Sequence, residues 1–346
     1  MSTPQRPIAI GIPVRDEAER LPRLLDALAV QTVGVESFAV CALLDGCTDE
    51  SEAVLLDARD RLGLDIRIRQ LPKAEANAGR ARREAMAMCL DAVGPVDEGV
   101  LLTTDGDSMP QPDWVEASCR ALKGADIVAG RIERTIRLVG CWRTRLEDYL
   151  DRLHALRRQI DPVACDPAPC HSSLGGASLG FRAGVYRRLG GFPAFPRGED
   201  KALVLRARRH GFRVRHDPAV LVYTSNRTVG RAPGGLADEL QQQLHSDLPP
   251  LVADPTVCVK HYRLQAALRR AYETGPAAIG AAAARYGYCE LHLKSVAADV
   301  SSSDAFVEII APEDCTPQAN VLPLPAAEEA LAALMAPARL RQAEAA

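Results

Sequence analysis

Residues 100–107 have the sequence VLLTTDGD, an apolar run that ends in two acidic residues separated by glycine. Such a run at 100–104 is typical of a buried strand. With only Gly106 between them, the carboxylates of Asp105 and Asp107 can reach one hard cation. Oxygen ligands suit Mg²⁺ or Mn²⁺, and these ions usually also hold substrate phosphates. The stretch therefore predicts a metal site at a strand end, with an ordinary Asp-Gly turn as the alternative.

The residues before this stretch alternate short β-rich runs with helical patterns. Strands are predicted at 8–14, 38–44 and 66–70, each followed by apolar residues at helical spacing. This alternation indicates an α/β fold with a mostly parallel mixed sheet between helices. Ligands of such sheets bind outside the carboxyl ends of the strands. Asp45 follows the second strand directly, so we expect it on the same edge as Asp105.

The residues after this stretch are more varied. A helix is predicted at 141–160, a loop rich in Pro, Cys and Ser at 161–174, and a strand near 219–223. Beyond Gly235 the composition changes to Gln- and Ala-rich helix with Pro interruptions. We therefore expect a catalytic domain over 1–235 and a mainly helical extension over 236–346, its last dozen residues disordered. The extension is interpreted as an acceptor lid or an oligomer contact. The second interpretation implies a homo-oligomer, and the sequence does not choose between the two.

Composition excludes several classes of protein. Of the 346 residues, 47% are apolar, enough for a large core, and the net charge of −3 argues against nucleic-acid binding. The ten cysteines include no C-x-x-C pair. No signal peptide is recognisable, and the apolar stretches fall short of the roughly 18 residues that span a bilayer. We expect a cytoplasmic protein without a transmembrane segment.

A second acidic segment, Glu199-Asp200, begins a predicted helix, and its Asp200 lies 93 residues after Asp107. Acidic residues at a helix start also serve as caps, which is the simpler interpretation. However, an enzyme that transfers a sugar with inversion needs a carboxylate to deprotonate the acceptor hydroxyl. It also needs positive charge to stabilise the departing diphosphate. The two acidic segments together supply both requirements if the sheet brings them into one site.

Two arginines, Arg227 and Arg231, follow the last predicted strand in a loop that contains glycine. Guanidinium groups on a mobile loop can close over a diphosphate and exclude water. Surface charge without a binding role is the alternative.

Five segments, taken in order, resemble family 2 glycosyltransferases, which are inverting enzymes of the GT-A fold. The resemblance covers residues 8 to about 230. The matching segments are IAIGIPVRDE (8–17), LDGCTDES (44–51), residues 77–83, LLTTDGDSMPQPDW (101–114) and GGASLGFRAGVYRRLGGFPAFPRGED (175–200).

The resemblance implies a role for each matching residue. Asp45 would contact the nucleobase, and Asp200 would be the catalytic base, with Glu199 supporting it or contacting the acceptor. Asp105 and Asp107 would hold the metal ion, and an arginine among 80, 82 and 83 would lie near the base or diphosphate. The residues expected to bind the nucleotide-sugar are Pro13, Arg15, Glu17, Asp45, Arg80, Arg83, Asp105, Gly106, Asp107, Arg227 and Arg231.

The sequence departs from the family pattern at several positions. The family often has Asn at the position of Asp16, Asp at the position of Leu44 and Ser at the position of Cys47. Some nucleobase contacts are therefore expected to differ from those of the family. Many GT-A enzymes have a late His as third metal ligand, and His216 is the candidate substitute here. The Gln-x-x-Arg-Trp motif of processive synthases is absent. The resemblance thus implies single transfer from a nucleotide-sugar, with UDP favoured, to a small-molecule, lipid or glycan acceptor.

Three other functions are weighed against this one. Residues 176–180 satisfy G-x-S-x-G, the nucleophile elbow of serine hydrolases, but no buried strand precedes them. A sugar-phosphate nucleotidyltransferase would need a Gly-rich loop after the first strand, where this chain has PVRD. A non-catalytic nucleotide-sugar-binding protein would have no need of both acidic segments.

Overall fold

The computed structural model describes residues 7–72, 77–136, 141–225, 248–312 and 320–336. They group into two compact units, each with hydrophobic core residues of its own. The first unit combines Met1–Arg137, Ser173–Arg206 and Val214–Gln241, and the second combines Leu138–Ser172, Ala207–Arg213 and Gln242–Ala346.

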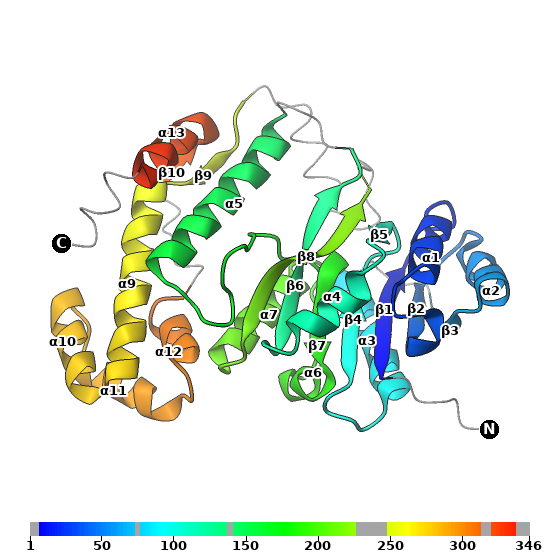
Figure 1. Cartoon of the computed structure of the whole chain (residues 1–346), viewed down its shortest axis with the longest axis horizontal. Coiled ribbons are helices and arrows are strands. Elements are labelled where there is room, and N and C mark those ends of the chain that lie inside the picture. Colours follow the sequence, from blue (N-terminus) through cyan, green and yellow to red (C-terminus); the bar gives the residue numbers. More distant parts are fainter. Residues whose placement is uncertain (1–6, 73–76, 137–140, 226–247, 313–319, 337–346) are drawn as a thin grey trace. The chain divides into compact units, whose positions relative to one another are not determined.

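The first unit is built on one mixed sheet (Figure 1). Its strands are β1 (Ile8–Val14), β2 (Phe38–Asp45), β3 (Asp65–Leu71), β4 (Val100–Thr103), β5 (Ser108–Pro110), β6 (Ile127–Arg134), β7 (Leu179–Arg182) and β8 (Val214–Thr224). They lie in the order β3-β2-β1-β4-β7-β6-β8-β5. The pairs among β3, β2, β1 and β4 are parallel, as is β6 with β8, whereas β7 runs antiparallel to both neighbours. The loops after β1, β2 and β4 therefore meet at one edge.

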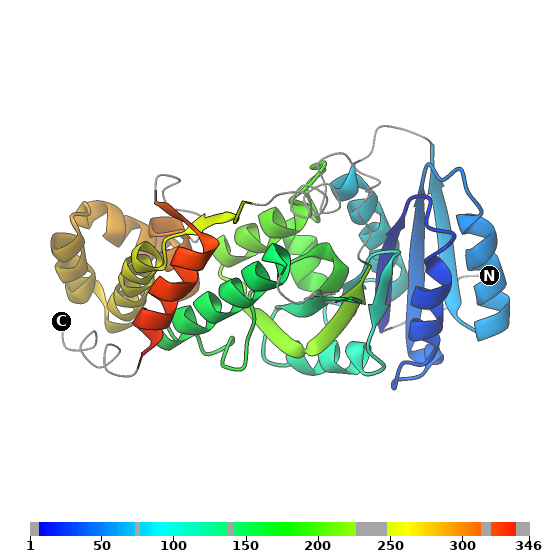
Figure 2. The same ribbon diagram turned by 90° about the horizontal axis from the view of Figure 1, so that it is seen from above.

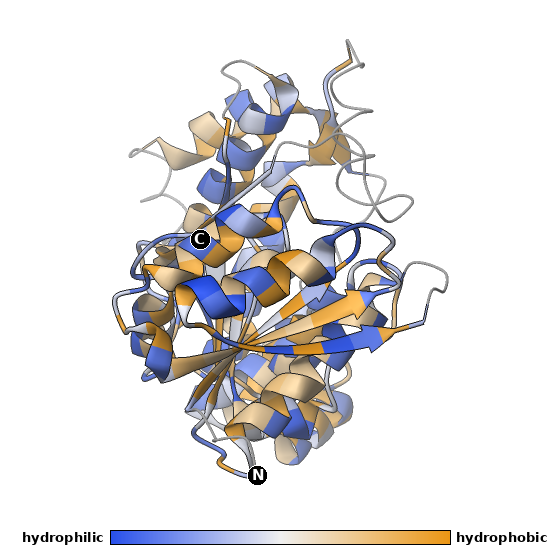
Figure 3. Ribbon diagram, turned by 90° about the vertical axis from the view of Figure 1, so that its right-hand side faces the viewer, coloured by the Kyte–Doolittle hydropathy of each residue, from blue (hydrophilic) through white to orange (hydrophobic). Residues whose placement is uncertain are grey.

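Helices cover both faces of this sheet. They are α1 (Leu21–Ala29), α2 (Ser51–Leu62), α3 (Ala78–Val93), α4 (Trp114–Ala121), α6 (Ala183–Leu189) and the start of α7 (Glu199–Arg209), with 3-10 turns at Val35–Ser37 and Gly176–Ser178. Alternate side chains of a strand point to opposite faces. Ile10 of β1 joins one core with Leu24 of α1, whereas a Cβ on Gly11 would lie 3.0 Å from the sulfur of Met86 on α3. Figure 2 shows the strands of this unit with helices beside them, and Figure 3 shows that hydrophobic and hydrophilic residues alternate along the helices.

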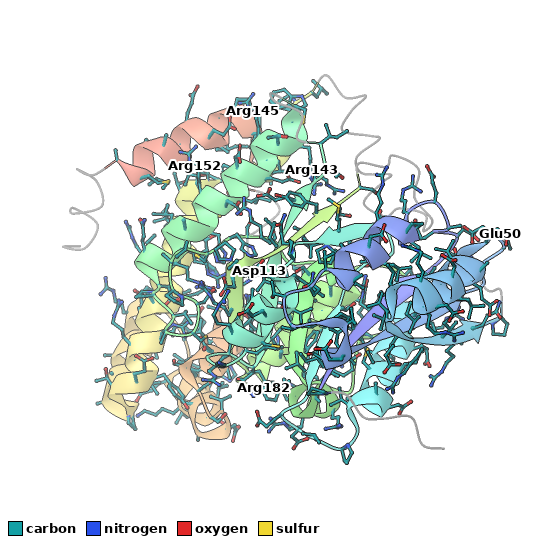
Figure 4. The ribbon with its side chains drawn as sticks, turned by 45° about the vertical axis from the view of Figure 1, so that its right-hand side comes forward. Glu50, Asp113, Arg143, Arg145, Arg152 and Arg182 are labelled. Carbon is teal, nitrogen blue, oxygen red and sulfur yellow. The ribbon has the colours of Figure 1, made fainter. Side chains whose placement is uncertain are left out.

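The second unit is mainly helical. Its elements are α5 (Trp142–Ile160), α9 (Pro255–Thr274), α10 (Pro276–Tyr286), α11 (Glu290–Asp299), α12 (Ser303–Ile310), α13 (Leu324–Met335) and the strand pair β9 (Leu251–Ala253) and β10 (Val321–Pro323). Proline stands in the first turn of α9, α10 and α13, where its missing N–H costs no hydrogen bond. One core joins α5, α9 and α13, and Arg145 of α5, labelled in Figure 4, pairs with Glu328 of α13.

The predicted α/β fold is confirmed, and so are the four parallel strands, each to within about one residue. The strand predicted near 219–223 is β8, which begins earlier, at Val214. The predicted division at residue 235 stays a prediction; in space, residues 138–172 group with the C-terminal helices. Within the described residues no helix is long and apolar enough to cross a membrane.

Candidate functional site

The acidic loop lies between β4 and β5 at the carboxyl edge of the sheet. The backbone N–H of Thr104 donates to the carbonyl of Gly11 at 3.2 Å, and that of Ser108 donates to the carbonyl of Asp105 at 3.0 Å. A Cβ on Gly106 would lie 3.1 Å from Cγ of Glu17, so glycine lets the loop pack closely on that side chain. Glu17 is itself buried. The structure thus places the loop after β1 directly against residues 105–107.

Asp107 is held by hydroxyl groups at the end of β8. The Ser225 hydroxyl donates to Oδ2 of Asp107 at 2.5 Å, and the Thr224 hydroxyl lies 3.5 Å from Oδ1. The antiparallel pairing of Ser108 with Thr224 brings these segments together. Sequence reasoning missed Ser225, because a serine after a strand carries no signal without the pairing that aims it.

The assignment of His216 as third metal ligand is wrong in this geometry. His216 pairs with Ala129 on β6, whereas Thr224 pairs with Arg134, five positions further along that strand. At about 3.3 Å per residue, this is a separation of roughly 16 Å along the sheet. A ligand must approach a cation within about 2.0–2.6 Å, so His216 cannot share an ion with Asp107.

Asp45 is buried at the end of β2 and accepts hydrogen bonds from two arginines. Arg15, after β1, donates to Oδ2 at 3.0 Å, and Arg80 of α3 donates to Oδ1 at 2.8 Å. Both guanidinium groups are partly exposed, with 23% and 36% of their side-chain surface accessible. The structure therefore brings together three of the residues expected around the nucleotide, and Pro13 is half-buried in β1 next to them.

The loop after β1 is tied to the loop after β2 through Asp16. Its backbone is left-handed, with φ of +52°, a conformation that Asp and Asn adopt more readily than other non-glycine residues. This preference explains why Asp can replace Asn there. Oδ1 of Asp16 accepts from the backbone N–H of Thr48 at 2.7 Å, and the Cys47 thiol donates to the carbonyl of Val14. Cys47 and Asp16 thus hold the loops after β1 and β2 together beside Asp45.

Helix α3 begins against the segment that precedes α7. The Asn77 side chain caps the helix by accepting from the backbone N–H of Arg80, and it also donates to the carbonyl of Ala194 at 3.1 Å. A Cβ on Gly79 would lie 2.1 Å from the carbonyl oxygen of Pro193, so only glycine permits this approach. Asn77 and Gly79 thereby set the position of the arginines that follow.

Arg82 of α3 is buried between the two acidic segments. Its Nη2 donates to Oδ1 of Asp105 at 2.8 Å and its Nε to Oε1 of Glu199 at 3.1 Å. Its Nη1 donates to the Thr103 hydroxyl and to the carbonyl of Gly176, both at 2.9 Å. Burial alone would lower the pKa of Arg82, but the carboxylates of Asp105 and Glu199 raise it, so this group stays charged.

The second acidic segment begins α7, directly after Gly198. Glu199 is buried against Arg82; burial raises the pKa of this carboxyl and Asp200 adds to the effect, while Arg82 opposes it. Asp200 is half-buried and is held by backbone N–H groups, that of Gly176 at 3.0 Å on Oδ2 and that of Lys201 at 2.7 Å on Oδ1. Glu199 is thus placed to support the site, whereas Asp200 retains an accessible edge.

The remaining predicted arginines lie elsewhere or outside the described residues. Arg83 is exposed on α3, and its assignment to the nucleotide pocket stays a prediction. Arg82, one position earlier, is the arginine that contacts both acidic segments. Arg227 and Arg231 fall within 226–247, outside the described residues.

The G-x-S-x-G segment does not have the geometry of a hydrolase nucleophile. An elbow serine follows a strand and precedes a helix, with its hydroxyl exposed. Ser178 instead precedes β7, is buried, and accepts from the indole N–H of Trp114 at 3.2 Å. The segment is a structural connection, and its Gly176 peptide contacts both Arg82 and Asp200.

The edge of the sheet therefore combines the carboxylate of Asp45 and its two arginines, a loop with two aspartates, and the Glu199-Asp200 segment, which Arg82 joins to that loop. The oxygen donors of Asp105, Asp107 and Ser225 fit a hard divalent cation. The arrangement can hold an anionic, cation-bound ligand beside the partly exposed carboxylate of Asp200.

Comparison with known proteins gives a family match. The model of a family described as glycosyltransferase like family 2 matches residues 4–237, about two thirds of the chain. Among curated proteins, none matches this sequence.

Solved structures show weaker similarity. S. aureus TarS 1-349, in complex with UDP-GlcNAc, is 14% identical with a TM-score of 0.47. The match covers 75% of this chain and 66% of TarS 1-349. In the structure of the longer TarS chain, the match covers 43% of that chain. The mannosyltransferase PcManGT from Pyrobaculum calidifontis, in complex with GDP-Man and Mn²⁺, is 16% identical with a TM-score of 0.48, covering 99% of this chain and 81% of that one. A mycobacterial protein is 18% identical with a TM-score of 0.42, covering 72% and 80%.

Proposed function

The chain belongs to glycosyltransferase like family 2, a family of transferase enzymes, and on this premise we propose that it moves one sugar from a nucleoside-diphosphate-sugar to an acceptor hydroxyl with inversion. The observation that carries the proposal is the meeting of Asp105 and Glu199-Asp200 around Arg82, although they are far apart in sequence. A capping role alone would not require the second acidic segment to meet the first.

Asp200 is proposed as the general base. Each of its oxygens accepts one backbone N–H, and a carboxylate has about four lone-pair positions, so acceptor capacity remains for an alcohol proton. In the proposed step the acceptor hydroxyl gives its proton to Asp200 as its oxygen attacks the anomeric carbon. The bond from that carbon to the diphosphate oxygen breaks on the opposite face, and its electron pair leaves with the diphosphate.

Asp105, Asp107 and Ser225 are proposed to hold Mg²⁺ or Mn²⁺. Asp105 uses one oxygen for Arg82, and its side chain is 36% exposed, so its other oxygen is accessible to an ion. When bound, the ion would offset the charge of the leaving diphosphate. Since the three groups offer only oxygen, they suit Mg²⁺ as well as Mn²⁺.

Asp45, Arg15 and Arg80 are proposed to hold the nucleotide. The carboxylate of Asp45 can accept an N–H of the base, such as the imide N–H of uracil, and UDP is proposed as the nucleotide. Either arginine can then turn towards a phosphate, because both are partly exposed and have flexible stems. Pro13, Glu17 and Gly106 are proposed to line the same pocket, and Arg227 and Arg231 to close over the diphosphate.

The remaining features of the proposal concern the whole chain. Residues 1–235 are proposed as the catalytic domain and 236–346 as the acceptor side or an oligomer contact. The acceptor is proposed to be a small molecule, lipid or glycan, and a cytoplasmic location stays a prediction.

The proposal is tested with a panel of UDP-, GDP- and dTDP-sugars in a thermal-shift assay, with and without Mn²⁺. A ligand that binds only the native state raises the melting temperature in proportion to its affinity. Donors that bind are then incubated with acceptor alcohols, and the product's anomeric configuration is determined by NMR. Retention of configuration would contradict Asp200 as the base of a single displacement. Release of pyrophosphate from a nucleoside triphosphate and a sugar phosphate would indicate a nucleotidyltransferase instead.

A substitution in the acidic loop tests the metal assignment. We expect Asp107→Asn to weaken nucleoside-diphosphate binding about tenfold or more with Mn²⁺ present and to change it little in EDTA, because a neutral amide binds cations weakly. Isothermal titration calorimetry measures both affinities. Asp113→Asn is the control, since Asp113 is exposed at the start of α4 and its side chain makes no capping hydrogen bond (Figure 4). Equal losses with and without the metal would contradict the assignment.

A further inference from the structure

The buried guanidinium of Arg82 uses all three of its nitrogens within the site. Nη2 donates to Asp105, Nε donates to Glu199, and Nη1 donates to both Thr103 and the carbonyl of Gly176. The side chain is only 7% exposed, so bulk water cannot replace these partners. Its Cζ also lies over the ring of Phe192, 5.9 Å from the ring centre, which limits the movement of the guanidinium.

The Gly176 peptide extends this arrangement to Asp200. The carbonyl of Gly176 accepts from Arg82, while its N–H donates to Oδ2 of Asp200 at 3.0 Å. A Cβ at position 176 would lie 2.2 Å from Cζ of Arg82, so glycine is required for the guanidinium to lie beneath this backbone. A continuous path of hydrogen bonds therefore runs from Asp105 through Arg82 and Gly176 to Asp200.

We infer that Arg82 is a positioning residue that sets the proposed base, Asp200, relative to the donor-binding carboxylate, Asp105, through the backbone of Gly176. This inference rests on the proposed function, because it takes Asp200 as the base. Arg82 itself does not touch the reacting atoms; it fixes the groups that do. Its charge also offsets three carboxylates that would otherwise repel one another, those of Asp105, Glu199 and Asp200.

Lysine cannot reproduce this geometry. Its ammonium is a single point of charge, whereas the planar guanidinium donates in several fixed directions at once. In Arg82→Lys the charge stays, so Asp105 keeps a cationic neighbour, but the contacts to Gly176 and Glu199 cannot all be made together. We therefore expect the loss to fall on turnover more than on donor binding.

The test is a double-mutant cycle on kcat between Arg82→Lys and Asp200→Asn. We expect Arg82→Lys to lower kcat by about 10–100-fold, since misplacing a group by about 1 Å can cost about a hundredfold. The affinity for donor nucleotide with Mn²⁺ should change less than about threefold. If Arg82 acts through Asp200, adding Arg82→Lys to Asp200→Asn lowers kcat little further. Losses that multiply in the double variant would overturn the inference.

A second readout does not depend on turnover. Hydrogen exchange of the peptides covering 173–180 should be faster in Arg82→Lys than in the wild type, because the Gly176 carbonyl loses its buried partner. Arg69→Lys is the control, since Arg69 is exposed and pairs with Glu84 and Asp91 on the surface. Unchanged exchange in a folded Arg82→Lys would overturn the inference even if no sugar transfer were found, whereas absence of transfer by the wild type would count against the proposed function alone.

Gly176→Ala approaches the same contact from the other side. The added methyl group would collide with the guanidinium, so a similar fall in kcat with donor affinity kept is expected. If Arg82→Lys fails to fold, this variant provides the measurement. Wild-type kcat together with wild-type exchange in Gly176→Ala would contradict the inference.

Discussion

Each unit contains an arginine that joins two carboxylates from distant segments, and the two arrangements differ in what surrounds them. In the first unit Arg82 joins Asp105 and Glu199. In the second, Arg269 of α9 donates to both oxygens of Asp161 at 2.8 and 3.0 Å and to Asp304 of α12 at 2.5 Å. Burial by itself would lower the pKa of both arginines, but the neighbouring carboxylates raise it.

The difference lies in the other groups nearby. Asp161 ends α5 and is 1% exposed, so its carboxylate is fully used in fastening α5 to α9. Beside Arg82, by contrast, Asp105 is 36% exposed and Asp200 is held by backbone N–H groups with an accessible edge. A buried ion pair alone therefore does not indicate a binding site. Carboxylates that are held in place and still open to solvent do indicate one.

The largest expected effect is a fall in kcat when a carboxylate near Arg82 is changed, but not when one near Arg269 is changed. We expect Asp200→Asn to lower kcat by about 10²–10⁴-fold, the usual contribution of a general base, with donor binding kept. Asp304→Asn, the counterpart in the second unit, should leave kcat within about twofold, which lies inside ordinary variation for a residue remote from the chemistry. Steady-state kinetics on both variants measures this. Full activity of Asp200→Asn would remove that residue from the mechanism.

The next effect concerns stability. We expect Arg269→Met to lower the free energy of unfolding of the second unit by about 3 kcal/mol, because it leaves the buried charge of Asp161 without its partner. Denaturant unfolding followed by circular dichroism gives this value. Arg270→Met, one residue along the same helix, is the control, since Arg270 is exposed. If the two variants were equally stable, the Arg269 pairs would contribute nothing measurable.

The smallest effect is a pH dependence at Glu199. Burial raises the pKa of this carboxyl, so between its ordinary and raised values the folded protein binds more protons than the unfolded chain. The free energy of unfolding therefore falls as pH rises through that range, and the loss is complete above the raised pKa. Glu199→Gln cannot ionise and should lack this decline.

Melting temperatures between pH 4.5 and 7 measure the difference. The Tm of Glu199→Gln relative to the wild type should rise with pH, while Glu52→Gln, at an exposed position of α2, should show no such trend. A trend of the opposite sign would mean that attraction to Arg82 outweighs burial.

Much of the first unit could be predicted because its signals are local. Strands β1 and β2 are almost wholly buried, so their continuous apolar runs mark them without reference to the rest of the chain. Strand β5 has three residues and β6 ends in alternating charged residues, so neither has a clear pattern and both were missed. Their place in the sheet depends on pairing with β7 and β8.

The sequence places the acidic groups of the candidate site more closely than it places the arginine between them. Asp45 and Asp105 lie at the ends of β2 and β4, and Asp200 lies in the first turn of α7, as their positions in the sequence predict. Three neighbouring arginines, at 80, 82 and 83, are candidates in the sequence, and the structure buries Arg82 between the two acidic segments. The choice between them depends on which side of α3 faces the sheet, which is set by the contact of Gly79 with Pro193.

The α/β class and the parallel strands can be predicted from the amino-acid sequence alone, because burial and helical spacing act over a few neighbouring residues. The contacts of Arg82 with the two acidic segments, the position of Ser225 beside Asp107, and the distance of His216 from Asp107 along β8 are visible only in the folded chain. These outcomes depend on strand register and helix docking. Register and docking come from contacts between segments far apart in the chain, so no local pattern contains them.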